Sequence, residues 1–145
     1  MAGGRKPRAR ATVNVSIDVP DLEAGLRFYA SVFGFAETAR PFPTMAILDG
    51  NNVTVCMHAK PAGSRSSPAG ADVRRYERHW TPVHLDIIVT DIEPARARAL
   101  AAGARPESDI TDHLWGRMAL LADPFGHGVC LIQFTGRGYD AIATG

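Results

Sequence analysis

An internal repeat constrains this chain more than any other feature of its sequence. The segment NVSIDVPDLE at 14–23 is similar to HLDIIVTDIE at 84–93, and both contain the pattern V-x-D-[LI]-E. In each copy apolar residues alternate with polar ones, which predicts a strand with one buried and one polar face. Because the unit occurs twice, the sequence predicts two modules of similar structure.

Each repeated strand is expected to lead into a helix. Asp21 and Asp91 stand where a helix N-cap is favoured, and Gly34 and Gly103 suit the two helix ends. Three shorter strands should then follow each helix, near 35–39, 44–48 and 53–58 in the first half and near 104–107, 117–122 and 128–134 in the second. The sequence therefore predicts an α+β fold of two βαβββ modules.

These elements place a single domain at 12–135. The expected parts of the chain are a disordered basic tail at 1–11, modules at 12–59 and 81–135, a linker at 60–80, and a C-terminal tail at 136–145. The linker is rich in Pro, Gly and Ser, which is typical of a connecting segment. A length of 145 residues fits one domain with a sizeable core.

Charge and cysteine content argue against several classes of protein. The formal net charge is +1, but Arg5, Lys6, Arg8 and Arg10 lie in the first ten residues, so the body lacks the basic field of a nucleic-acid groove. No apolar run reaches the roughly 18 residues of a membrane span, and no apolar signal segment follows the basic start. Two cysteines do not make a disulfide framework. We therefore expect a cytoplasmic protein without a nucleic-acid or membrane partner.

Three motifs carry a resemblance to a known superfamily. They are VPDLEAGLRFYASVFGF at 19–35, VTDIE at 89–93 and LLADPFGHGVCLIQF at 120–134, the last similar to a DPxGxxxEL ending. On these motifs the chain resembles the vicinal oxygen chelate superfamily, which includes glyoxalase I, extradiol dioxygenases, fosfomycin-resistance enzymes and bleomycin-resistance proteins. The resemblance covers about residues 13–134. It implies two sheets that curl into a cup, with helices outside and polar side chains inside.

The resemblance also implies where a metal ion would be held. Metal-using members carry His or Gln, Glu, His and Glu at positions that correspond here to Asn14, Thr54, His84 and Cys130, with Cys56 replacing Thr54 if the register slips. Catalytic divalent metals require imidazole and carboxylate ligands. Only His84 is such a ligand, so we expect no metal and no other cofactor, with a divalent metal as the alternative.

Other side chains are implied as candidates for binding or catalysis. The ligand-binding candidates are Asn14, Ser16, Asp18, Phe42, Thr54, Cys56, His84, Trp115, Ile132, Arg137 and Tyr139. The catalytic candidates are His84, Asp86 and Cys130.

Asp86 could orient His84, act as a base, or be a solvated carboxylate at the rim. Cys130 is either a packed small residue or a nucleophile activated by His84. Trp115 is either a ligand wall or a subunit contact.

Two functions remain as alternatives. The first is binding of a small aromatic or planar organic molecule in the cup without a metal, as in drug-binding resistance proteins. The second is an enzyme: a metal-free lyase, isomerase or cyclase that uses His84 with Asp86 or Cys130, or a metal-dependent glyoxalase or dioxygenase. A homodimer is expected, with the segment RRYERHW at 74–80 leading a strand at the contact rather than binding nucleic acid.

Overall fold

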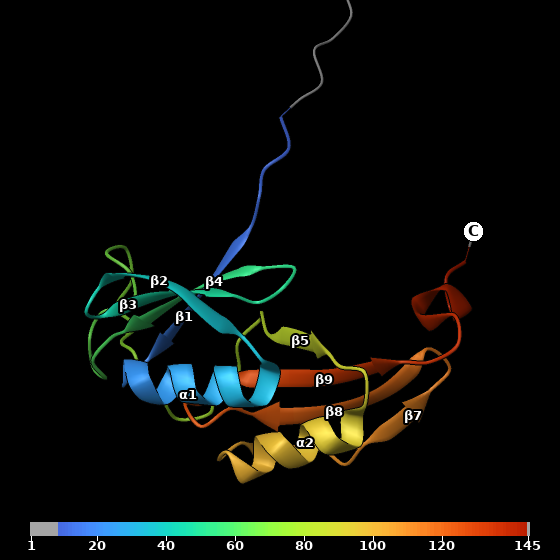
Figure 1. Cartoon of the computed structure of the whole chain (residues 1–145). Helices are drawn as coiled ribbons and strands as arrows, with labels where there is room; N and C mark the ends of the chain where they lie inside the picture. The colour runs from blue at the N-terminus through green and yellow to red at the C-terminus, as the bar shows by residue number, and fades with distance from the viewer. Residues whose placement is uncertain (1–8, 145) are drawn as a thin grey trace, which may run out of the picture.

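The first module has the predicted βαβββ order. The computed structural model describes residues 9–144 of the chain. The module contains β1 (Asn14–Val19), α1 (Leu22–Phe33), β2 (Ala36–Phe42), β3 (Met45–Asp49) and β4 (Thr54–Ala59). Its strands form a sheet in the order β1-β4-β3-β2, with β1 parallel to β4. The prediction for this half is therefore confirmed (Figure 1).

The second module repeats this plan with one additional strand. It contains β5 (Leu85–Ile88), α2 (Ile92–Ala101), β6 (Arg105–Pro106), β7 (Thr111–His113), β8 (Gly116–Ala122) and β9 (Gly128–Phe134), followed by the short 3-10 helix η1 (Gly138–Ala141). The sheet order is β5-β9-β8-β6, and β7 also pairs with β8. The sequence prediction missed β7, because its three residues are all exposed and carry no apolar alternation.

The helices begin where the sequence predicted. The Ala24 N–H donates to Asp21 Oδ1 at 2.7 Å, and α1 ends at Gly34 with a φ of 73°. Asp91 precedes α2 with the same extended backbone, but its side chain caps no N–H group. Within residues 9–144, no helix is long and apolar enough to cross a membrane.

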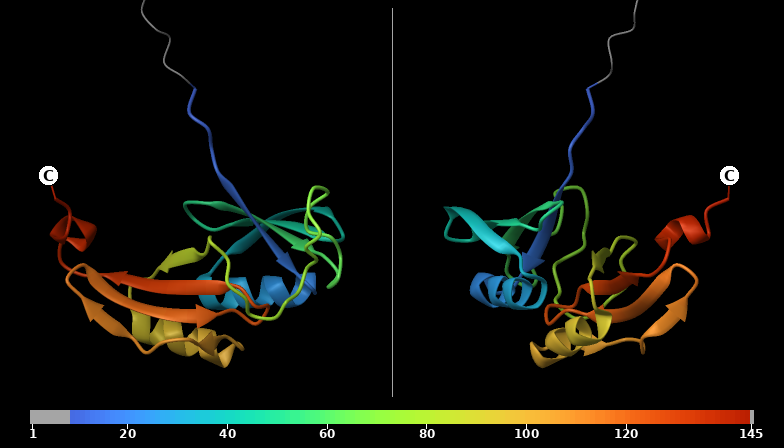
Figure 2. Two further views of the ribbon diagram at one scale, coloured as in Figure 1. Left: turned by 180° about the vertical axis from the view of Figure 1, so that it is seen from behind. Right: turned by 45° about the vertical axis from the view of Figure 1, so that its right-hand side comes forward.

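Each sheet is covered by one helix, and the two helices contact each other (Figures 1 and 2). The buried core contains apolar side chains from both helices and both sheets, among them Val19, Tyr29, Leu48, Val55, Met57, Ile92, Leu121 and Leu131. In the described part of the chain no strand of one sheet pairs with a strand of the other. The modules are therefore joined by helix packing and by the segment between them.

A buried carboxylate also joins the modules. Asp123, in the turn before β9, is 2% exposed. It accepts a hydrogen bond from the Tyr29 hydroxyl on α1 at 2.8 Å and from the Phe125 and His127 N–H groups at 2.9 Å. Burial, and secondarily the Asp123 charge, raises the pKa of Tyr29 well above its usual value. The phenol therefore stays protonated as a donor, and the carboxylate is satisfied without access to water.

The turn that carries Asp123 lies directly against the linker. Gly126 has a φ of +90°, and a Cβ atom there would lie 2.6 Å from the Tyr76 carbonyl oxygen. The linker is also held at other points, since Tyr76 donates its hydroxyl to the Lys60 carbonyl at 2.6 Å. The segment at 60–80 is thus an ordered wall of the domain as well as a connection.

A comparison of alanine substitutions at two glycines distinguishes the free-energy cost of the close contact from the cost of the positive φ. Gly126 and Gly63 have φ values of +90° and +80°, but a Cβ atom at Gly63 would meet nothing within 4 Å. We expect Gly63→Ala to lower the free energy of unfolding by about 1 kcal/mol and Gly126→Ala by about 2–4 kcal/mol. Urea unfolding of the two variants measures the difference. Equal losses would show that the linker does not press on the turn.

Candidate functional site

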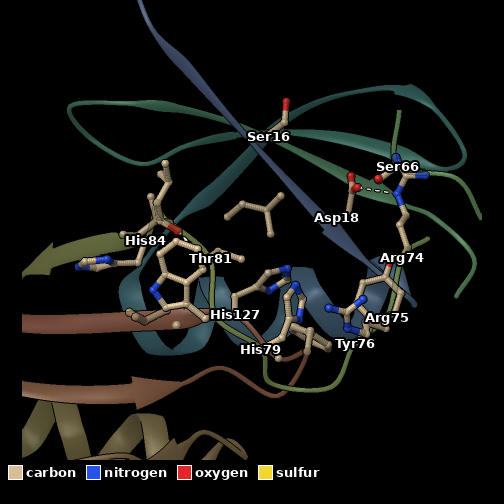
Figure 3. Close-up of a pocket in the computed structure, with 18 of the residues that line it drawn as sticks. Ser16, Asp18, Ser66, Arg74, Arg75, Tyr76, His79, Thr81, His84 and His127 are labelled. Atoms are coloured by element: carbon tan, nitrogen blue, oxygen red, sulfur yellow. Dashed lines mark hydrogen bonds and ion pairs between the residues drawn. The ribbon is translucent and has the colours of Figure 1, made fainter. Parts of the chain in front are cut away.

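A cavity of about 640 Å³ lies between the two modules. Its walls come from β1, from the linker, from the residues that enter β5, and from the turn before β9 (Figure 3). This volume lies within the roughly 300–1,000 Å³ typical of small-molecule sites. The cavity is the candidate functional site.

One part of the cavity surface is apolar and aromatic. Val15 and Ile17 come from β1, and Leu85 and Val129 come from the second sheet. Trp80 also lines the cavity and is 81% exposed, so its ring is available for stacking on a ligand. This part of the surface therefore offers apolar contacts and one exposed aromatic ring.

One ion pair in the cavity wall holds the linker in place. Arg74 Nε lies 2.7 Å from Asp18 Oδ2, and Arg74 also donates to the Arg65 carbonyl oxygen. The Arg74 side chain is only 18% exposed. Asp18, a predicted ligand-binding residue, is therefore engaged by a residue of the chain itself.

Three basic side chains converge in the middle of the cavity. Figure 3 shows Arg75, His79 and His127 pointing toward one another from the linker and from the turn before β9. His127 Nδ1 lies 2.7 Å from Asp123 Oδ2, so the buried carboxylate fixes the orientation of the ring. Sequence reasoning missed all three as site residues. The signal for Arg75 and His79 was the mixture of basic and aromatic residues at 74–80, which was interpreted as a subunit contact, and His127 stood within the turn motif without being singled out.

The predicted residues of the first module lie on one face of its sheet. Asn14 lies opposite Thr54 and Ser16 opposite Cys56 in the register of β1 and β4. Ser16 is among the residues that line the cavity, but its side chain points away from the histidines (Figure 3). These four candidates therefore share one face of the first sheet, and their role in binding stays a prediction.

In the second module, Asp86 lies between the other two catalytic candidates. His84 Nε2 is 3.1 Å from Asp86 Oδ1, and both side chains are about half exposed. Asp86 lies opposite Cys130 in the register of β5 and β9. Ile132, two residues further along β9, is 2% exposed, as is Cys130. His84 lines the cavity, but its ring points away from His79 and His127 (Figure 3).

The surroundings of Cys130 favour a packed residue over a nucleophile. Burial, with a smaller contribution from the Asp86 charge, raises the pKa of the Cys130 thiol to about 11. The thiolate is the reactive form of cysteine, so this thiol is almost wholly unreactive near neutral pH.

Alkylation tests this directly. In a Cys56→Ser variant, which leaves Cys130 as the remaining cysteine, we expect iodoacetamide to react at pH 7.5 roughly 100-fold more slowly than with an unperturbed thiol. Mass spectrometry follows the reaction, and the unfolded variant gives the reference rate. Rapid alkylation of the folded protein, slowed by His84→Ala, would show that Cys130 is activated.

Two of the remaining aromatic candidates, Trp115 and Tyr139, lie in an aromatic cluster outside the cavity. Trp115 stacks on His113 with ring centroids 4.9 Å apart, and it contacts Tyr139 and Phe134 at 5.4 and 6.4 Å. This aromatic cluster is not part of the cavity surface. Arg137, next to η1, and Phe42, which is 62% exposed on β2, do not line the cavity either.

The side chains at the superfamily's metal positions do not fit a divalent metal. His84 contacts Asp86, and the Cys130 thiol, protonated at neutral pH, lies 3.8 Å from the Leu131 carbonyl oxygen. Asn14 and Thr54 offer only weak neutral donors. Between residues 9 and 144, no three His, Cys, Asp or Glu side chains are grouped to hold a metal ion.

Sequence comparison assigns most of the chain to one protein family. Residues 14–132 match the family model of the glyoxalase-like domain. An uncharacterized protein of Mycobacterium bovis is 31% identical over 115 residues, which cover 75% of this chain and 74% of that protein. An uncharacterized protein of Mycobacterium tuberculosis has the same identity over 66% of its own length.

Solved structures show the same fold at low sequence identity. The fosfomycin resistance protein FosX from Mesorhizobium loti aligns with a TM-score of 0.67 and 17% identity over 93% of this chain and 99% of that one. TioX from Micromonospora sp. ML1 aligns with a TM-score of 0.61 and 20% identity over 86% and 100%. A glyoxalase-related enzyme from Fulvimarina pelagi aligns with a TM-score of 0.67 and 22% identity over 86% and 88%.

Proposed function

Because this chain belongs to the glyoxalase-like domain family, we propose that it binds a small planar organic molecule between its modules without a resident metal ion. The observation that carries the proposal is the cavity of about 640 Å³, which combines apolar walls, an exposed Trp80 and a group of polar side chains. FosX, a fosfomycin resistance protein, has the same fold, which supports a drug-binding or resistance-like role.

The two tryptophans allow a direct binding test. A Trp115→Phe variant leaves Trp80 as the only tryptophan, in the cavity wall. We expect planar aromatic compounds to change its fluorescence in a saturable way, because a stacked ligand alters the surroundings of the indole ring.

The matched control is Trp80→Phe, which retains Trp115 in the aromatic cluster outside the cavity. Its fluorescence should not respond at the same ligand concentrations. If a broad panel of planar compounds leaves Trp80 unaffected, or if both variants respond equally, the proposed binding site is wrong.

The side chains at the four metal positions also predict the metal content of the purified protein. Protein purified without an affinity tag should contain far less than one equivalent of Fe, Mn, Ni or Zn by elemental analysis, because one imidazole without a carboxylate ligand binds such ions weakly. Near-equimolar metal that disappears in His84→Ala would contradict this part of the proposal.

An acid–base enzyme without a metal is the second candidate. The supporting observation is the 3.1 Å contact between His84 Nε2 and Asp86 Oδ1, which orients the imidazole and leaves Nδ1 for a substrate. A lyase, isomerase or cyclase reaction could use this pair. Cys130 contributes less to this candidate, because its raised pKa keeps the thiol protonated. A glyoxalase or dioxygenase that depends on a metal is disfavoured by the donor set.

The expected homodimer and cytoplasmic location stay predictions.

A further inference from the structure

We infer that the cavity selects organic acids in their anionic form, and that Arg75, His79 and His127 hold the negative group. The inference rests on the proposed function, since it names the class of ligand that the same cavity would bind. Its basis is the convergence of three basic side chains on one part of the cavity (Figure 3).

The orientation of His127 is built into the fold. Its Nδ1 contacts Asp123 Oδ2 at 2.7 Å, and its backbone N–H donates to Asp123 Oδ1 at 2.9 Å. The Asp123 side chain is fully buried, whereas the His127 side chain is 35% exposed. Nε2 is therefore the nitrogen left for a ligand. When the ring is protonated, the carboxylate balances its charge and Nε2–H can donate to an anion.

His79 and Arg75 reach the same region from the linker. His79 Nδ1 lies 2.9 Å from the Glu77 carbonyl oxygen, which can only accept, so Nδ1 carries a hydrogen, and Nε2 has no hydrogen-bond partner among residues 9–144. Arg75 is exposed, and its guanidinium makes no hydrogen bond or ion pair with any residue in the described range 9–144. A guanidinium that no protein group engages can bind both oxygens of a carboxylate.

The acidic residues near the cavity leave the charge of Arg75 unpaired. Among the described residues that line the cavity, the acids are Asp18 and Asp72. Asp18 is already paired with Arg74 at 2.7 Å, and Asp72 forms no ion pair with Arg75 within residues 9–144. Asp123 balances the charge of His127 when that ring is protonated. The net positive charge in the middle of the cavity therefore comes from Arg75, and from His79 when its ring is protonated, while Trp80 and the apolar wall suit the planar body of the ligand.

Three compounds with the same ring and different charge test the inference: benzoate, benzamide and benzylamine. Their dissociation constants are measured near pH 6.5 by Trp80 fluorescence in the Trp115→Phe protein. We expect benzoate to bind about 10-fold or more tightly than either other compound, because hydrogen bonds to a charged group are the stronger ones. Added salt should weaken the binding of benzoate and leave that of benzamide almost unchanged.

Substitutions then assign the preference to particular side chains. Arg75→Gln and His127→Gln should each reduce the preference for benzoate over benzamide several-fold. Arg27→Gln removes the same charge from an exposed position on α1 outside the cavity and should leave the preference unchanged. Because His127→Gln also alters the turn around Asp123, the deciding variant is Arg75→Gln, which removes no hydrogen bond or ion pair within residues 9–144.

The outcomes separate the two proposals. If the neutral and cationic compounds bind as well as benzoate, the inferred selection of anions is wrong while the binding function stands. If benzoate is preferred but Arg75→Gln has no more effect than Arg27→Gln, the assignment to the basic cluster is wrong. If none of the three compounds binds, and no compound of the broad planar panel binds either, then both the binding function and the selection of anions are wrong.

Discussion

The buried carboxylate of Asp123 is the interaction on which the rest of the structure depends. One of its oxygens accepts from the Tyr29 hydroxyl of the first module and contacts His127 Nδ1, while the other accepts two backbone N–H groups of its own turn. A carboxylate this deeply buried would be strongly destabilising without these partners. The same group therefore joins the two modules, shapes the turn before β9, and orients a side chain of the candidate site.

The linker at 60–80 forms one wall of the cavity. The turn at Gly126 packs so closely on the Tyr76 backbone that no side chain fits between them. The pair of Arg74 with Asp18 holds the neighbouring part of the segment against β1. Because both contacts are specific, the linker places Arg75, His79 and Trp80 around one space. A flexible connection could join two modules, but it would not build a binding site.

Two of the positions that hold a metal in metal-using members of the superfamily, His84 and Cys130, have other surroundings in this chain. His84 interacts with Asp86, and Cys130 is buried with a pKa raised to about 11. A separate group of polar side chains, two imidazoles and a guanidinium, lies between the modules in a cavity that also has apolar lining. The fold is thus compatible with recognition that relies on hydrogen bonds and charge, with no Lewis acid required.

The sequence by itself determined the two modules, their helices, all strands but one, and the turn at Asp123, because these depend on local periodicity and on the turn and cap preferences of a few residues. It did not reveal β7, whose three polar residues have no periodic pattern. It placed Asp86 on the same strand face as His84, and the structure adds that the two side chains lie 3.1 Å apart. Only the tertiary structure decided that His127, His79 and Arg75 converge. These residues lie in a turn and a linker, whose positions are fixed by the contacts of Asp123 with Tyr29 and of Arg74 with Asp18 and not by any spacing along the chain.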